Sequence, residues 1–397
     1  MLNSVEIAKA GMAAKSVSIA ENAFANTKNG VDAPATQNLQ TVTLGNITAG
    51  EANATLTIAQ EAFWGGTVAD KTVTIGTIKD NGTKTTTVEI ADNAFVGQSL
   101  KTVGIDDMAA TTIEIGENAF ANKKNTDGDP ATQNLQTVTL GNITAGTAAS
   151  TFEAKKQAFW GGNVAAKSVT VGNITSDKLD ATFGEAAAEG KQLTNVTIGN
   201  MTANSVAIGA SAFSGGQLVN VDLGDMTATT LTVGEKAFAN SNENDVLNET
   251  IKIGELKTAN FTAEKAFQGP TKATSTYAVE IKSITGAITV PANTFVAPEK
   301  GTASYTVKED LAAATTANIV AGAFAGSQDT DGNNTTDVKF QGDYNDDFVA
   351  GTFTNVNSVD IAVAADGSAK NMTAATGRLA AFADAKTVFV GNIAADK

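Results

Sequence analysis

One short phrase recurs along the whole chain and constrains its fold more than any other feature. The phrase is clearest at residues 113–120, where the sequence reads IEIGENAF. Its two isoleucines alternate with Glu114, which is the period of a strand with one buried face. The glycine then allows the backbone to turn, and the final Ala-Phe pair places a small and a large apolar residue inside the bend. The phrase therefore predicts a compact strand-and-turn unit.

Phenylalanine closes this phrase at intervals of about 30 residues. A repeat of about 20–50 residues is typical of solenoids and propellers, whose units are each too small to bury an apolar face alone. A degenerate thirteenth copy carries Ala187-Ala188 where the Ala-Phe pair is expected, and Phe152 and Phe183 fall outside the phrase. We expect the phrase-closing phenylalanines to form the structural spine of the core. They are Phe24, Phe63, Phe95, Phe120, Phe159, Phe213, Phe238, Phe267, Phe295, Phe324, Phe353 and Phe382.

Each repeat also carries a second strand pattern, seen in Leu39–Leu44 with Leu39, Val42 and Leu44 on one face. Residues 45–49 follow as a turn, and the next phrase begins at residue 55. Valine and threonine at the strand positions favour stacking of successive coils as parallel strands. The sequence therefore predicts an all-β and irregular repeat solenoid, a right-handed stack of about thirteen coils. We expect one domain over residues 1–397, truncated within a repeat at each end.

Composition excludes several classes of function. The formal net charge is −15, and the chain contains no histidine and no cysteine. An acidic chain is repelled by phosphate backbones and anionic lipids, so we expect no nucleic-acid partner. No run of 18 apolar residues is present, so we expect no membrane insertion. Without histidine or cysteine, and without converging carboxylates, the sequence predicts no enzyme and no cofactor.

Two repeats carry a family resemblance. Residues 39–63 read LQTVTLGNITAGEANATLTIAQEAF, and residues 100–120 read LKTVGIDDMAATTIEIGENAF. Both resemble the BspA-type leucine-rich repeat, whose unit runs LxxIxIPxxVxxIGxxAFxxCxx. The cysteine and proline positions of that unit are unoccupied here. The resemblance implies a leucine-rich-repeat solenoid from a secreted, commonly bacterial, cell-surface protein that adheres to a protein or glycan of a host or neighbouring cell.

Additional length always follows the phenylalanine, as in residues 121–134 and 239–250. Stacking places such insertions along one edge, which in repeat proteins is often a binding face. Adhesion through these loops is the leading hypothesis for function. The alternative is self-association into a surface layer or fibre, because unpaired end coils favour end-to-end stacking.

Two kinds of residue are candidates for ligand binding. Outward threonines flank the inward valines at Thr41, Thr43, Thr137 and Thr139. Their hydroxyl and methyl groups form an array that could order water or ice. The alternative is structural, because the β-branched shape of threonine suits exposed strand positions. Trp64 and its copy Trp160 precede Gly-Gly and could stack on a sugar or pack over the coil edge.

Two loops are candidates for calcium, since oxygen ligands alternate around a glycine in both. The glycine and glutamate expected at the sixth and twelfth positions are missing, so solvated turns are the alternative. The possible ligands are Asp127, Asp129, Asp329, Asp331 and Asn333.

A polar residue recurs in the turn after the first strand, and stacked side chains there could hydrogen-bond the backbone of adjacent turns. Glycosylation of Asn-x-Thr sequons is the alternative role. The residues are Asn46, Asn142, Asn173, Asn200 and Asn392, with Asp225 in one copy.

Overall fold

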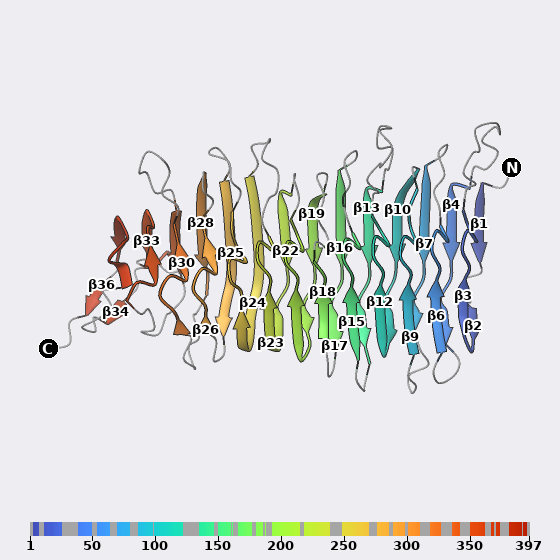
Figure 1. The fold of residues 1–397 in the computed structure, drawn as a ribbon, viewed down its shortest axis with the longest axis horizontal. Coiled ribbons are helices and arrows are strands. Elements are labelled where there is room, and N and C mark those ends of the chain that lie inside the picture. The colour runs from blue at the N-terminus through green and yellow to red at the C-terminus, as the bar shows by residue number, and fades with distance from the viewer. Residues whose placement is uncertain are drawn as a thin grey trace. The chain divides into compact units, whose positions relative to one another are not determined.

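The computed structural model divides into two compact units, which are described separately: unit 1 is Met1–Asn204 and unit 2 is Ser205–Lys397. The structure describes residues 3–7, 12–25, 39–49, 54–63, 70–79, 86–97, 99–121, 135–146, 150–159, 161, 166–176, 180–185, 187, 193–214, 218–238, 248–269, 276–285, 289–297, 301–309, 318–326, 336–341, 350–361, 367–368, 371–373, 381–390 and 392–394. These residues contain no α-helix. In each unit the coils follow one another in chain order, so that equivalent strands of successive coils stand side by side (Figure 1).

Unit 1 is a stack of coils, and a complete coil contributes three strands. The first strands are β1 (Ser4–Ile7), β4 (Thr41–Leu44), β7 (Lys71–Ile75), β10 (Leu100–Ile105), β13 (Thr137–Leu140), β16 (Lys167–Val171) and β19 (Leu193–Ile198). The middle strands are β2 (Met12–Ala14), β5 (Ile47–Ala49), β8 (Ile78–Lys79), β11 (Met108–Ala110), β14 (Ile143–Ala145), β17 (Ile174–Ser176) and β20 (Met201–Thr202). The third strands are β3 (Val17–Ile19), β6 (Ala54–Ile58), β9 (Thr86–Ile90), β12 (Thr112–Ile115), β15 (Thr151–Ala154) and β18 (Asp180–Phe183).

Each strand of unit 1 pairs in parallel with the corresponding strand of the next coil. Val42 lies opposite Val73, Ile47 opposite Ile78, and Leu56 opposite Val88. Aliphatic residues of one coil therefore pack on aliphatic residues of the next coil, and the inward side chains form a continuous core. The predicted solenoid of parallel strands is confirmed in this unit.

The middle strand is a correction to the sequence prediction, which interpreted residues 45–49 as a turn. Ile47–Ala49 forms β5 and pairs with β2 and β8. Three residues are too few to show a period in the sequence. Stacking in register supplies the hydrogen-bond partners that make this segment a strand.

Unit 2 has the same parallel stacking, with several strands fused into longer ones. Its long ladders contain β21 (Ser205–Ile208), β22 (Asn220–Leu223), β23 (Met226–Val233), β24 (Asn248–Thr262), β25 (Thr276–Thr285), β28 (Thr302–Val307), β31 (Thr336–Phe340), β33 (Ser358–Asp360) and β35 (Thr387–Phe389). Its short parallel sheets contain β26 (Thr289–Val290) with β29 (Asn318–Ile319), β27 (Phe295–Val296) with β30 (Phe324–Ala325) and β32 (Phe353–Thr354), and β34 (Asn371–Thr373) with β36 (Asn392–Ala394).

The phrase-closing phenylalanines form a stacked column of rings in each unit. In unit 1, Phe95 stacks between Phe63 and Phe120, with ring centroids 4.9 Å and 4.8 Å away. In unit 2, Phe295 stacks on Phe324 at 4.7 Å. All twelve are buried except Phe24, which is partly exposed. Repetition of one ring per coil thus produces a continuous aromatic column.

Phe152 and Phe183 also belong to the core, although they lie outside the phrase. Each is 1% exposed, and their rings meet edge to face at 5.6 Å. Both project inward from third strands, β15 and β18. Strand alternation therefore buries these two phenylalanines as deeply as the phrase-closing ones.

In every such turn that the structure describes, the residue two positions before the phrase-closing phenylalanine has a left-handed backbone. Asn118, two residues before Phe120, has φ 56°, and Lys236 has φ 54° at the same position before Phe238. Gly322 and Gly351 occupy that position in two later coils, each with φ 74°. The asparagine of the phrase is therefore explained by backbone conformation, since asparagine and glycine adopt this region at lower cost than other residues.

Gly116 has a different role from the flexible turn predicted for it. Its φ lies outside the left-handed range, and a Cβ built on it would come within 2.5 Å of the Asp92 backbone nitrogen and Oδ1 in the preceding coil. The Asp92 Oδ1 accepts a hydrogen bond from the Glu117 backbone N–H at 2.7 Å. Glycine is thus needed because adjacent coils approach closely at this corner.

Candidate functional site

The candidate threonines lie on the outward face of the first strands of unit 1. Thr41, Thr137 and Thr139 are exposed, and Thr43 is partly exposed. Strand register aligns their positions across seven coils into two rows, which we call the threonine face. One row contains Ser4, Thr41, Thr72, Thr102, Thr137, Ser168 and Asn195, and the other contains Glu6, Thr43, Thr74, Gly104, Thr139, Thr170 and Thr197.

The threonine face is nearly free of charge, since Glu6 is the one ionisable residue in its two rows. The hydroxyls of Thr41, Thr43, Thr137 and Thr139 make no hydrogen bond to a residue that the structure describes. These groups are therefore available to water or to a bound surface. Methyl groups lie beside the hydroxyls on every threonine, so the face offers both apolar contact and hydrogen bonding.

The corresponding face of unit 2 has different chemistry. Opposite charges alternate between neighbouring strands there, with Asp222 beside Lys252 and Lys252 beside Glu280. Lys339 Nζ lies 3.4 Å from the Asp360 carboxylate in the same row. Because these charges compensate one another along the stack, this surface is less available for an external ligand than the threonine face of unit 1.

The remaining candidate ligand residues lie outside the described residues. These are Trp64 and Trp160, and the possible calcium ligands Asp127, Asp129, Asp329, Asp331 and Asn333. Among the residues that the structure does describe, no group of three or more aspartate, glutamate, histidine or cysteine side chains could hold a metal ion. Sugar stacking on the tryptophans and calcium binding in the loops stay predictions.

The recurrent asparagine after the first strand forms a ladder of hydrogen bonds between coils. The Asn142 Oδ1 accepts from the Asn173 backbone N–H at 3.0 Å, and the Asn173 Oδ1 accepts from the Asn200 backbone N–H at 2.8 Å. Asp107 begins this ladder by accepting from Asn142 at 2.7 Å, and the Asn46 Oδ1 makes the equivalent bond to Thr77. In unit 2 the Asp225 Oδ1 accepts from Glu255 at 2.8 Å, whereas the Asn392 side chain is not described. These contacts give the residues a structural role, because they satisfy backbone donors at the corner.

Sequence reasoning missed a short acidic row on the third strands of unit 1. Glu89, Glu114 and Glu153 are in register on three successive coils. Lys155 forms an ion pair with Glu114, and that hydrogen bond raises the pKa of the Lys155 ammonium. The row was detectable in principle, since each glutamate follows the first inward residue of its phrase.

Sequence reasoning also missed buried ionisable groups at the start of the first strand. Lys71 and Lys167 are the first residues of β7 and β16, and both are fully buried. Each Nζ donates a hydrogen bond to a phenylalanine carbonyl two coils earlier, Phe24 and Phe120 respectively. Burial lowers the pKa of Lys71 to about 8 and that of Lys167 to about 7. The pKa of each lysine is therefore lower in the folded chain than in the unfolded chain. As pH rises above about 8 for Lys71 and about 7 for Lys167, the folded chain gains stability, because its amine is already neutral while the unfolded one still has to lose its proton.

The described residues give no sign of a catalytic centre. The chain has no histidine or cysteine. A small apolar cavity between the first coils is lined by aliphatic side chains such as Val17, Ile47 and Leu56, and its one polar lining residue is Thr57. No acid, base or nucleophile converges there.

A comparison with protein families identifies the repeats. The model of the BspA type leucine rich repeat region matches residues 72–153 and 173–284, in 6 copies. The matched segments contain coils of both units. They include Asp107, Asn142, Asn173 and Asn200 of the hydrogen-bond ladder, and Phe95, Phe120, Phe213, Phe238 and Phe267 of the ring columns. These two segments are therefore BspA-type leucine-rich repeats, the family that the sequence resembles.

Two further comparisons were negative, since no curated protein and no solved structure matches this chain. Within the described residues, we find no helix with the length and hydrophobicity needed to cross a membrane.

Proposed function

We propose that the chain is a non-enzymatic, secreted cell-surface repeat domain that adheres to a protein or glycan of another cell. Repeats of this family are often found in surface-associated proteins. The observation that carries the proposal is the threonine face of unit 1. This face extends over seven coils, presents hydroxyl and methyl groups, and carries one charged residue. The hydroxyls of the four candidate threonines have no hydrogen-bond partner among the described residues.

The geometry of this face suits adhesion better than catalysis. An extended outward sheet face gives many equivalent weak contacts, whereas an enzyme needs a few groups that converge on one reacting atom. The insertions at residues 121–134 and 239–250 are a second candidate surface in the same proposal, since loops carry much of the binding in repeat proteins.

We predict that two lysine substitutions on the threonine face weaken adhesion. The variant Thr139→Lys/Thr170→Lys places two long charged side chains on neighbouring coils, which blocks close contact with an uncharged surface. We expect binding to a glycan microarray and to immobilised fibronectin to fall by at least about tenfold, equivalent to roughly 1.4 kcal/mol. The free energy of unfolding should change by less than about 0.5 kcal/mol, because both positions are on the surface.

The matched control is Thr250→Lys/Thr306→Lys, which makes the same change at outward strand positions of unit 2. That variant should bind as the wild type does. Equal binding by both variants would remove the threonine face from the proposal and leave the insertion loops as the candidate. If the protein instead forms concentration-dependent oligomers in analytical ultracentrifugation and binds neither probe, self-association into a layer or fibre replaces adhesion.

A further inference from the structure

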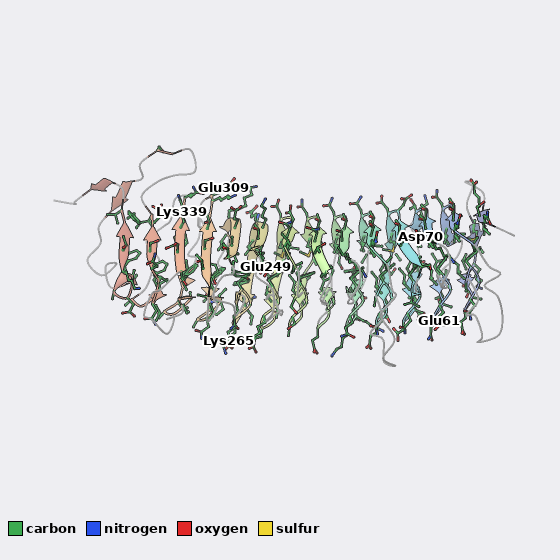
Figure 2. The ribbon with its side chains drawn as sticks, turned by 90° about the horizontal axis from the view of Figure 1, so that it is seen from above. Glu61, Asp70, Glu249, Lys265, Glu309 and Lys339 are labelled. Atoms are coloured by element: carbon green, nitrogen blue, oxygen red, sulfur yellow. The ribbon has the colours of Figure 1, made fainter. Side chains whose placement is uncertain are left out.

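Unit 2 contains a carboxyl group in its core. Glu249, the second residue of β24, projects inward and is 1% exposed, and its register partner on β25 is Tyr277, which is fully buried. Figure 2 labels Glu249 between the edges of the ribbon, where Lys265 and Glu309 are labelled. Neither carboxyl oxygen of Glu249 nor the Tyr277 hydroxyl has a hydrogen-bond partner among the described residues.

Within the part of the chain that the structure describes, no group around Glu249 supplies a compensating positive charge. The titratable group that faces it is the phenol of Tyr277. The ring of Tyr277 in turn lies against Tyr305, whose hydroxyl donates to the Phe267 carbonyl at 3.3 Å. The other ionisable residues of β22, β24 and β25 lie at outward or partly exposed positions, and β23 and β26 carry none. Those outward residues are Asp222, Lys252, Glu255, Lys257, Glu280 and Lys282.

An ionised carboxylate in this position would be costly. Transfer of an unpaired charge from water to a protein interior is far less favourable than transfer of a neutral acid, even after the protein relaxes. Burial therefore raises the pKa of Glu249 well above its usual range, and it raises the pKa of Tyr277 as well. Burial in the packed unit thus favours the neutral, protonated form of the carboxyl group.

We propose that Glu249, packed against Tyr277, is a proton-dependent latch between β24 and β25, which keeps unit 2 packed in acidic conditions and loosens it as pH rises. Loss of the proton puts an unpaired charge against Tyr277, and the charge is relieved when the start of β24 separates from the core and meets water. The chain has no histidine, so the usual side chain for a pH response is absent and a buried carboxyl group takes that role.

The direction of the effect follows from linkage. The pKa of Glu249 is higher in the folded unit than in the unfolded chain, where it is near 4.5. The stabilisation is therefore complete below about pH 4.5 and is lost as pH rises through the folded pKa. Over that window one proton is released on unfolding, so the folding equilibrium constant of unit 2 should fall by about tenfold per pH unit.

The test is urea unfolding of the full chain at pH 5, 7 and 9. All three tyrosines lie in unit 2 and both tryptophans lie in unit 1, so near-ultraviolet tyrosine signals follow unit 2 separately. We expect the wild-type unit 2 transition to move to lower urea as pH rises. Glu249→Gln, which removes the titration and keeps the shape, should remove most of that movement and leave the transition at pH 9 above that of the wild type.

Two further variants make the result decisive. Glu280→Gln changes a partly exposed glutamate on β25 that pairs with Lys308, and it should retain the wild-type pH dependence. Tyr277→Phe removes the orphaned hydroxyl but leaves the acid, so it should also retain the dependence. The proposal is overturned if Glu249→Gln and the wild type show the same dependence on pH, or if Glu280→Gln removes it as effectively.

Discussion

Replacement of Phe95 by alanine should lower the free energy of unfolding of unit 1 by about 3–5 kcal/mol. Phe95 is fully buried, and its ring stacks between those of Phe63 and Phe120. Its removal leaves a cavity in the middle of the column and also removes two ring contacts, each of which contributes roughly 0.5–1.5 kcal/mol beyond area burial. Urea titration followed by tryptophan fluorescence measures the loss.

Two further variants, one at a buried phenylalanine and one at an exposed phenylalanine, test this prediction. Phe152→Ala should also cost several kcal/mol, because Phe152 is buried as deeply as the column residues. Phe389→Ala should change stability by less than about 0.5 kcal/mol, since that ring is 52% exposed. A small effect of Phe95→Ala, comparable to that of Phe389→Ala, would contradict the assignment of the column to the core.

Replacement of Gly116 by alanine should destabilise unit 1 by about 3 kcal/mol, near the upper end for overpacking. The new Cβ would lie 2.5 Å from the Asp92 backbone nitrogen, so the two coils must separate at the corner. Separation also lengthens the hydrogen bond from the Glu117 N–H to the Asp92 carboxylate. The same urea titration measures this loss.

Gly104→Ala is the matched control, because no atom lies within 4 Å of a Cβ built at Gly104 on the outward face of β10. That substitution should be neutral or should stabilise unit 1 by up to about 1 kcal/mol, as alanine restricts the unfolded chain. If the two substitutions change the free energy of unfolding equally, the close approach of the coils at Asp92 is not the reason that residue 116 is glycine.

The sequence predicted the period, the first and third strands and the parallel stacking, because these depend on local alternation. It missed the middle strand, since Ile47–Ala49 is too short to alternate visibly and becomes a strand through pairing with neighbouring coils. The role of Gly116 was also missed, because a close approach between coils is a contact between residues in different repeats.

The candidate sites were predictable to a lesser extent. Outward positions of the threonines follow from alternation, but their rows depend on the register between coils. Buried Lys167 and Glu249 escaped prediction because charged residues at the start of a strand are usually exposed. A signal did exist, since Leu193 is the register partner of Lys167 and marks that position as inward.

The register between coils is the central claim, since the core, the ring columns and the threonine face all depend on it. The natural chain has no cysteine, so engineered pairs can be tested without interference. Thr139 and Thr170 are register partners on neighbouring strands. Parallel neighbours lie about 4.8 Å apart, within the Cα separation of about 4.4–6.8 Å that a disulfide requires.

Oxidation of the Thr139→Cys/Thr170→Cys variant, read by mass spectrometry of its peptides, tests this register most directly. We predict rapid formation of the intramolecular disulfide in the native protein and none in urea-unfolded chain under the same brief oxidation. The pair Thr139→Cys/Ser168→Cys, shifted by two residues, should not form a disulfide in the native protein. Efficient bridging of the shifted pair, with none between Thr139→Cys and Thr170→Cys, would contradict the stacked-coil register.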